Sequence, residues 1–157
     1  MRLSANSIWF LLLLLFATHC IEAQAMPLKI KRYLDRKYSS WNLSPSVKEC
    51  TANVNNGVVA GDFNGDRRRD FEVKITQGNK GFILAFLRVG TDFKPFVLHH
   101  YDAEEAKFSG LGIWKRGEVF EYNDKSFRLK HDAPSDYHCE SDVGRIHYYQ
   151  NGKFVGY

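Results

Sequence analysis

The most chemically specific stretch of the sequence is a short run of acidic and amide residues. Side-chain oxygens recur at the first, third, fifth and ninth positions of this run, as Asp62, Asn64, Asp66 and Asp70. Calcium takes six to eight oxygen ligands at about 2.3–2.6 Å, and alternating acidic residues in a tight turn bring several oxygens to one point. The spacing therefore predicts a calcium site, with the backbone carbonyl of Arg68 and water completing the shell.

The same residues also fit a metal-free turn. In this alternative the carboxylates accept backbone N–H groups and are neutralised by Arg67, Arg68 and Arg69, which belong to the same run. The sequence favours calcium in a structural role and leaves the metal-free turn open.

A second group of candidates lies nearer the C-terminus. If folding brought His131, Asp132 and His138 into one cleft, the chain would be a small secreted hydrolase. No paired cysteine or H-x-x-E-H spacing supports zinc, and Ser109 and Ser141 lack a G-x-S-x-G setting. We therefore expect a protein that is not an enzyme, with this hydrolase as the alternative.

Residues 1–25 have the pattern of a cleavable signal peptide. Arg2 supplies a positive charge, residues 8–17 form an apolar run, and Ala23-Gln24-Ala25 matches the small-x-small cleavage pattern. The apolar run is too short to span a bilayer, which needs roughly 20 residues. A lipoprotein would use Cys20, but His19 stands before it where a small residue is required. We expect cleavage after Ala25 and a periplasmic or extracellular protein.

Cleavage would leave residues 26–157, which suit a single domain, and two cysteines, Cys50 and Cys139. In an oxidising compartment these two cysteines are expected to form a structural disulfide, because no Cys-x-x-Cys spacing points to redox chemistry. The bridge would close a loop of about 90 residues, for which the chain-entropy model gives roughly 4–5 kcal/mol. A reactive thiol is the alternative.

The net charge of +4, with both signs interspersed, does not indicate a nucleic-acid partner. The basic run Arg67-Arg68-Arg69 and the basic residues near position 30 could attract an anionic envelope, although such charges more often form a solvated face. We expect a protein or glycan ligand at the cell envelope and no transmembrane segment after cleavage.

Hydrophobic spacing predicts one helix followed by strands. Residues 27–39 carry an amphipathic helical pattern. Residues 71–75 alternate apolar and charged side chains, so this strand is expected to bury one face and to expose Glu72 and Lys74 on the other. Residues 82–89 are almost continuously apolar, which is typical of a central strand covered on both faces.

Turn residues separate the predicted strands. The strongest signal is Asn151-Gly152, which predicts a type I′ hairpin with Tyr148 and Phe154 on adjacent strands, because both turn positions need positive φ. Weaker signals occur at residues 77–79, 90–92, 115–117 and 123–124. Consecutive hairpins predict a mainly β fold: an antiparallel meander with one N-terminal helix, in a small α+β exported domain.

The acidic run and the strands around it resemble the repeat unit of the FG-GAP/VCBS group, which includes integrin-α N-terminal domains. The residues that carry the resemblance are Gly57-Val58-Val59-Ala60-Gly61-Asp62-Phe63-Asn64-Gly65-Asp66, followed by Asp70-Phe71-Glu72-Val73. Members of this group bind calcium in a D-x-[DN]-x-D-G-x-x-D loop between strands. The resemblance implies side-chain ligands at Asp62, Asn64, Asp66 and Asp70 and a backbone ligand at Arg68.

Two features of the chain differ from the propeller members of that group. Arg67 stands where the pattern has glycine, and the chain holds one repeat where a propeller needs several. The resemblance is therefore to small single-repeat bacterial exported proteins, not to a full propeller. The sequence as a whole predicts an exported, non-enzymatic, calcium-stabilised module that binds an unknown ligand.

Overall fold

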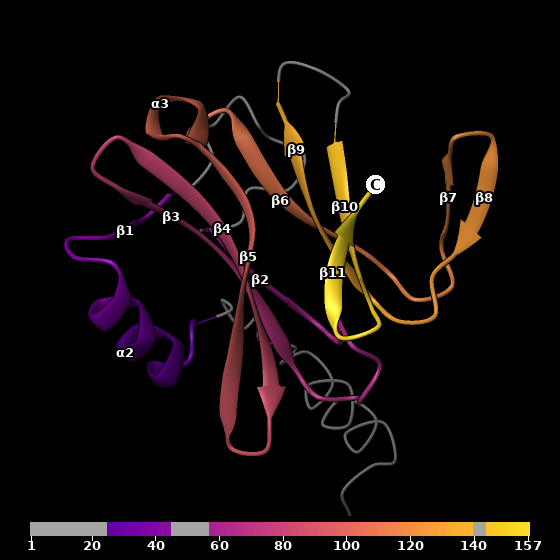
Figure 1. The fold of residues 1–157 in the computed structure, drawn as a ribbon, viewed down its shortest axis with the longest axis horizontal. Coiled ribbons are helices and arrows are strands. Elements are labelled where there is room, and N and C mark those ends of the chain that lie inside the picture. The colour runs from indigo at the N-terminus through magenta and orange to yellow at the C-terminus, as the bar shows by residue number, and fades with distance from the viewer. Residues whose placement is uncertain (1–24, 45–56, 140–143) are drawn as a thin grey trace, which may run out of the picture.

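Two antiparallel sheets and a separate hairpin make up most of the fold (Figure 1). In this computed structural model, residues 25–44, 57–139 and 144–157 are described. The first sheet has the order β1-β3-β4-β5, and β2 also pairs with β3. Its strands are β1 (Asn42–Leu43), β2 (Val58–Gly61), β3 (Asp70–Gln77), β4 (Lys80–Val89) and β5 (Asp92–Asp102).

The second sheet follows the short helix α3 (Ala103–Ala106) and has the order β11-β10-β9-β6. All strand pairs are antiparallel. The mainly β fold with an N-terminal helix is confirmed, and the described strands form no propeller. The remaining strands are β6 (Ser109–Trp114), β7 (Val119–Tyr122), β8 (Lys125–Arg128), β9 (Ala133–His138), β10 (Gly144–Gln150) and β11 (Lys153–Gly156), with β7 and β8 forming the separate hairpin.

The predicted helix is present as α2 (Leu28–Lys37) and covers one face of the first sheet. Ile30 and Leu34, one turn apart, are fully buried against the apolar face of β2, β3 and β4. Tyr33 meets the ring of Phe86 edge-on, with ring centroids 5.5 Å apart. The helix is thus held by packing of its apolar stripe, while its basic residues face outward.

The predicted turns all lie between strands. At Asn151 and Gly152 φ is +52° and +81°, as a type I′ turn requires. Tyr149 pairs with Phe154 and Tyr148 with Val155 across the resulting hairpin. The predicted placement of Tyr148 and Phe154 on adjacent strands is confirmed.

The prediction that Glu72 and Lys74 face solvent is wrong, because both side chains are fully buried. The second sheet packs against this face of the first. Val59, Ile83 and Leu111 form a core between the two sheets. The alternation in residues 71–75 therefore separates two different buried environments, not a core from water.

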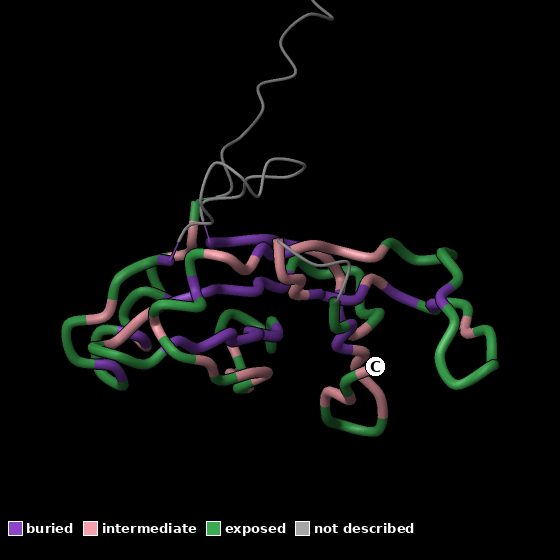
Figure 2. The backbone as a smooth tube through the Cα atoms, turned by 90° about the horizontal axis from the view of Figure 1, so that it is seen from above, coloured by how far each residue is buried: buried purple, intermediate pink, exposed green. Residues whose placement is uncertain are grey.

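A third core joins the β7–β8 hairpin to the second sheet. Phe120, Leu129, Ala133 and Ile146 are buried there. Figure 2 shows the buried segments along the middles of the strands and the exposed ones at the turns. Apolar contacts thus join the second sheet to one face of the first sheet, and the β7–β8 hairpin to the second sheet.

Several predictions concern residues that the structure does not describe. The signal peptide lies outside the described residues except for Ala25, and Cys50 also lies outside them. The pairing of Cys50 with Cys139 therefore stays a prediction. Among the described residues, no helix has the length and apolar character needed to cross a membrane.

Candidate functional site

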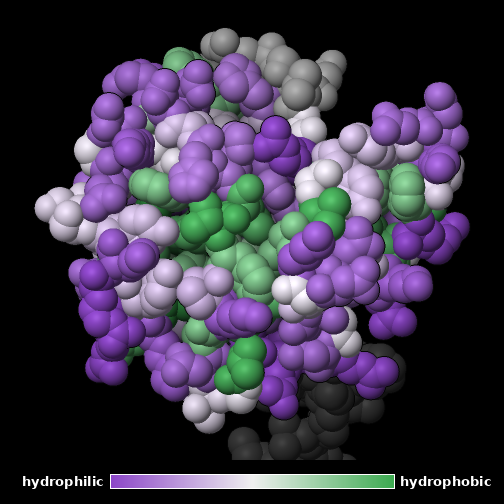
Figure 3. All heavy atoms as spheres, in the orientation of Figure 1, coloured by the Kyte–Doolittle hydropathy of each residue, from purple (hydrophilic) through white to green (hydrophobic). Residues whose placement is uncertain are grey.

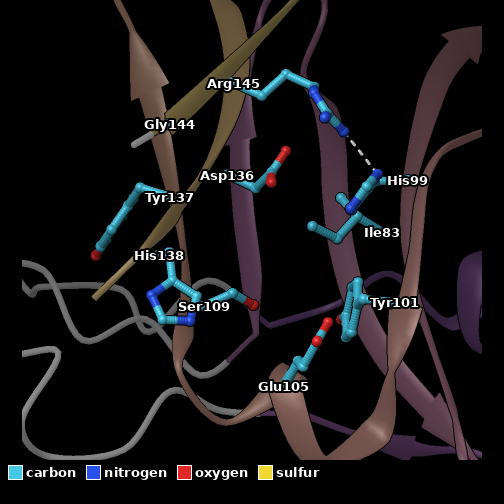
Figure 4. Close-up of a pocket in the computed structure, with 10 residues that line it drawn as sticks. All are labelled: Ile83, His99, Tyr101, Glu105, Ser109, Asp136, Tyr137, His138, Gly144 and Arg145. Carbon is cyan, nitrogen blue, oxygen red and sulfur yellow. Dashed lines mark hydrogen bonds between the residues drawn. The ribbon is translucent and has the colours of Figure 1, made fainter. Parts of the chain in front are cut away.

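A pocket of about 190 Å³ lies between the two sheets. Figure 3 shows that hydrophobic side chains gather in the middle of this face of the molecule and are ringed by hydrophilic ones. Strands β4 and β5 supply one wall, and β6, β9 and β10 supply the other. The pocket is lined by Ile83, His99, Tyr101, Glu105, Ser109, Asp136, Tyr137, His138, Gly144 and Arg145 (Figure 4).

The buried side chain of His147 holds Asp136 in place. The Nε2 atom of His147 lies 2.5 Å from Oδ1 of Asp136, and the two side chains are 3% and 15% exposed. Because Arg145 pairs directly with Asp136 across β9 and β10, His147 lies two residues further along β10 on the same face. His147 therefore fixes one oxygen of the Asp136 carboxylate, and it is Asp136 that lines the pocket.

His99 and Arg145 bridge the two sheets across the pocket. Arg145 donates a hydrogen bond to Nδ1 of His99 at 2.6 Å (Figure 4). Because a guanidinium only donates, Nδ1 must accept, so the ring is neutral and carries its proton on Nε2. Burial lowers the pKa of His99 against the opposing charge of Asp136, and the nearby charge of Arg145 lowers it further, which also favours the neutral ring.

Two buried ionisable residues, Glu72 and Lys74, lie on the same face of the first sheet as Ile83. Lys74 pairs with Ile83 across β3 and β4, and Glu72 is two residues before Lys74. Both carboxyl oxygens of Glu72 are buried without a hydrogen-bond partner among the described residues. Burial, and secondarily the charge of Asp136, raises the pKa of Glu72 well above its ordinary value. Glu72 therefore holds its proton more strongly than an exposed glutamate does.

Lys74 connects this buried region to α3 and β6. Its Nζ donates to the carbonyls of Ala106, at 2.8 Å, and Ser109. Burial lowers the pKa of Lys74 to about 8, and burial also raises the pKa of Tyr101. Perturbed pKa values concentrated around one pocket are typical of a functional site.

The predicted calcium loop is held by hydrogen bonds from its own backbone. Asp62 accepts from the N–H groups of Gly65 and Arg67, at 2.8 and 3.0 Å. Asn64 accepts from the N–H of Asp66 at 3.0 Å. Asp66 accepts from the N–H of Arg68 at 2.8 Å. Each of these three side chains therefore closes a turn within the loop.

Asp70 connects the loop to the first sheet. Its carboxylate accepts from the N–H groups of Phe63, at 2.8 Å, and Arg88, at 2.7 Å. Burial raises the pKa of Asp70 to about 6, against the effect of these two hydrogen bonds, and the charges of Asp66 and Asp62 raise it further. Asp70 is fully buried, so it anchors the loop at the start of β3.

The loop residues do not form a ready cation shell as they are placed. No group of three or more His, Cys, Asp or Glu side chains among the described residues could hold a metal ion. The sixth position has the positive φ of such loops, at +63°, although it carries Arg67. The hydrogen bonds match those of the metal-free alternative, and calcium binding stays a prediction.

The three residues of the hydrolase alternative do not share one pocket. His138 lines the inter-sheet pocket, whereas His131 lines a second pocket beside the β7–β8 hairpin. Asp132 accepts hydrogen bonds from the N–H of Arg116 at 3.0 Å and from Nζ of Lys115 at 3.4 Å. It therefore serves as a connection between loops.

Of the residues that come together around the inter-sheet pocket, the sequence singled out His138, but it did not predict the pairing of Asp136 with His147 or of His99 with Arg145. Asp136 and His138 alternate on β9, and Arg145 and His147 alternate on β10, with Ile146 between the latter two. Polar residues at every second position of two strands joined by a short connection would have placed these four side chains on one face. Their burial depends on the first sheet, which this signal does not report.

No family model, curated protein or solved structure matches the chain.

Proposed function

We propose that this protein is an exported, non-enzymatic binding module that holds a small polar ligand between its two sheets. The observation that carries the proposal is the pocket lined by polar groups from both sheets, in which His147 fixes Asp136 and Arg145 contacts His99. Convergent polar groups held rigidly in a concave site are what a small-molecule site needs.

The charges of the pocket favour a ligand with an amino group. Glu105 and Asp136 supply carboxylates, and Arg145 supplies a cation at the opposite end from Glu105 (Figure 4). An ammonium group near the carboxylates and an acidic group near Arg145 would both be satisfied. A volume of about 190 Å³ suits a molecule the size of a free amino acid.

The hydrogen bonds of the two imidazoles favour binding over acid–base catalysis. His147, the partner of Asp136, is 3% exposed and is not among the residues that line the pocket. The Nδ1 atom of His99 accepts from Arg145, so this ring has no free basic nitrogen to take a proton from a ligand. Both rings therefore serve to position charged neighbours.

One observation favours the alternative, a small hydrolase. Ser109 and His138 pair across β6 and β9, and both line the pocket. The hydroxyl of Ser109, however, donates to the carbonyl of Ala106 at 3.2 Å. Hydrolysis of p-nitrophenyl acetate should be compared between the wild type, Ser109→Ala and the exposed-site control Ser126→Ala. Loss of activity in Ser109→Ala alone would replace the binding proposal with the hydrolase.

Binding can be tested by titrating the purified protein with free amino acids, ethanolamine and glucose while recording backbone amide NMR signals. We expect an amine-bearing probe to shift the signals of His99, Asp136 and Arg145. Glu105→Gln should weaken that binding at least fivefold. Glu104→Gln is the matched control, because Glu104 is on the same short helix, does not line the pocket and pairs with Lys107 at 2.7 Å. Equal effects of the two variants, or no shift with any probe, would reject the proposal.

A further inference from the structure

A second pocket, of about 410 Å³, lies between the β7–β8 hairpin and the β10–β11 hairpin. Figure 1 shows the β7–β8 hairpin standing apart from the second sheet on the side of β10. This pocket shares no lining residue with the inter-sheet pocket. Aromatic and basic side chains line it, among them Phe127, Arg128, Lys130, His131, Tyr148 and Tyr157.

Aromatic rings form the walls of this pocket. Phe120 and Phe127 stack with centroids 5.3 Å apart, and Tyr157 packs against Phe127 at 5.6 Å. Tyr148, from β10, stacks on His131 at 4.4 Å with the rings nearly parallel. Phe127, Tyr148 and Tyr157 are only partly buried. The pocket thus presents ring surfaces on which a flat or ring-shaped molecule can stack.

The charged side chains of the pocket are all basic. Arg128 and Lys130 are exposed and line it, and no acidic side chain in the described part of the chain does so. Gln150 and Asn151 add amide groups at the β10–β11 turn. A site of this composition favours an anion and disfavours a cation.

Backbone carbonyls on both sides hold the ring of His131 in the wall of the pocket. Its Nδ1 and Nε2 atoms lie 2.9 and 3.0 Å from the carbonyl oxygens of Asp132 and Tyr149. The parallel ring of Tyr148 packs on the imidazole, so the two rings together form one flat surface of the pocket.

We propose that this second pocket binds a small organic anion built on a ring. Its carboxylate, phosphate or sulfate group would contact Arg128 and Lys130, and its ring would stack on Tyr148 or Phe127. The inference does not depend on the inter-sheet pocket, whose carboxylates favour the opposite charge. Sugar acids and nucleoside monophosphates share this chemistry, so both are tested.

The test is isothermal titration of the purified protein at low salt with two matched pairs of probes. The pairs are glucuronate with glucose and uridine monophosphate with uridine. We expect the anionic member of at least one pair to bind at least tenfold more tightly than its neutral partner, and the pair that does so identifies the source of the ligand. Binding should weaken as salt is raised.

Two charge-reversing variants locate the site. Lys130→Glu should weaken binding of the anionic probe at least tenfold, since Lys130 is exposed and its side chain can change without loss of the fold. Lys80→Glu makes the same change in net charge at an exposed position on the first sheet and should leave affinity unchanged. Failure of both anions to bind, equal affinity for the neutral partners, or equal effects of the two variants would overturn the proposal.

Discussion

Asp62 and Asp132 are joined by two hydrogen bonds between distant parts of the chain. The N–H of Asp62 donates to Oδ2 of Asp132 at 3.3 Å, and the N–H of Asp132 donates to the carbonyl of Asp62 at 3.0 Å. The preceding residue must be small, because a Cβ on Gly61 would lie 2.9 Å from the same carboxylate oxygen. The acidic loop is thereby attached to the start of β9, and the first sheet to the second.

Asp132→Ala should therefore lower the free energy of unfolding by about 1–3 kcal/mol, because it leaves N–H groups of Asp62 and Arg116 without their acceptor. Asp132→Asn keeps one acceptor oxygen and should lose less. Urea unfolding measures both effects. Glu121→Ala, at an exposed position on β7, is the control, and a loss of similar size there would contradict the connecting role of Asp132.

Glu72→Gln should change how the free energy of unfolding depends on pH, because the variant buries no ionisable carboxyl group at this position. The pKa of Glu72 is raised well above 4.5 in the folded protein, so the folded state keeps a proton that the unfolded chain loses above that pH. This group's contribution to stability is present below pH 4.5 and falls as pH rises toward the folded pKa, by at most about 1.4 kcal/mol per pH unit. Urea unfolding of the wild type and Glu72→Gln from pH 5 to 8 should show the variant gaining relative stability as pH rises. A constant difference would contradict the raised pKa.

Arg67→Gly should stabilise the acidic loop. Arg67 has a φ of +63°, a region that costs an L-residue about 1 kcal/mol and glycine almost nothing. Its N–H bond to Asp62 is retained in the variant. Thermal unfolding should show a gain of about 1 kcal/mol. Arg68→Gly removes the same charge without relieving a positive φ and should show no gain.

Calcium should raise the melting temperature if the acidic loop binds it. A ligand that binds only the folded state adds about 2.7 kcal/mol at 100 times its Kd. The adjacent arginines favour weak binding, in the 10⁻⁴–10⁻³ M range of extracellular modules. Melts in chelator and in millimolar calcium should differ for the wild type and coincide for Asp66→Ala. An unchanged wild-type melt would leave the loop as a turn held by its own N–H groups.

The proposed disulfide between Cys50 and Cys139 can be tested directly. Titration of the exported, oxidised protein with a thiol reagent should detect no free thiol. Reduction should lower the melting temperature, because closing a loop of about 90 residues stabilises by up to roughly 4–5 kcal/mol. Two titratable thiols under native conditions would exclude the bridge.

Local features of the fold were predictable from the sequence. The helix α2 follows from the spacing of Ile30 and Leu34, and the β10–β11 turn follows from Asn151-Gly152, because each depends on neighbouring residues alone. The exposure of Glu72 and Lys74 was predicted wrongly, because their burial depends on a second sheet that is distant in sequence. A period of two shows that the faces of a strand differ, but it does not show whether the polar face meets water or a second sheet.

In the two candidate sites, too, the local features were predictable from the sequence, whereas contacts between distant residues were not. The spacing of Asp62, Asn64 and Asp66 predicts a tight polar turn, and the structure has one. Whether the oxygens face N–H groups or a cation depends on the backbone path, which spacing does not contain. The pairing of Asp136 with His147 depends on which strands become neighbours, so it required the fold.

The chain connectivity of the two sheets has a consequence for the order of folding. β3, β4 and β5 follow one another through short turns. β6, in contrast, pairs with β9, and the whole β7–β8 hairpin lies between these two strands in the sequence. Closing the longer loop costs more chain entropy, so the β3–β5 meander forms early and the β6–β9 ladder late. We expect the inter-sheet pocket, which needs both sheets, to be completed after the rate-limiting step of folding. Substitutions in its walls should leave the refolding rate nearly unchanged and appear as faster unfolding.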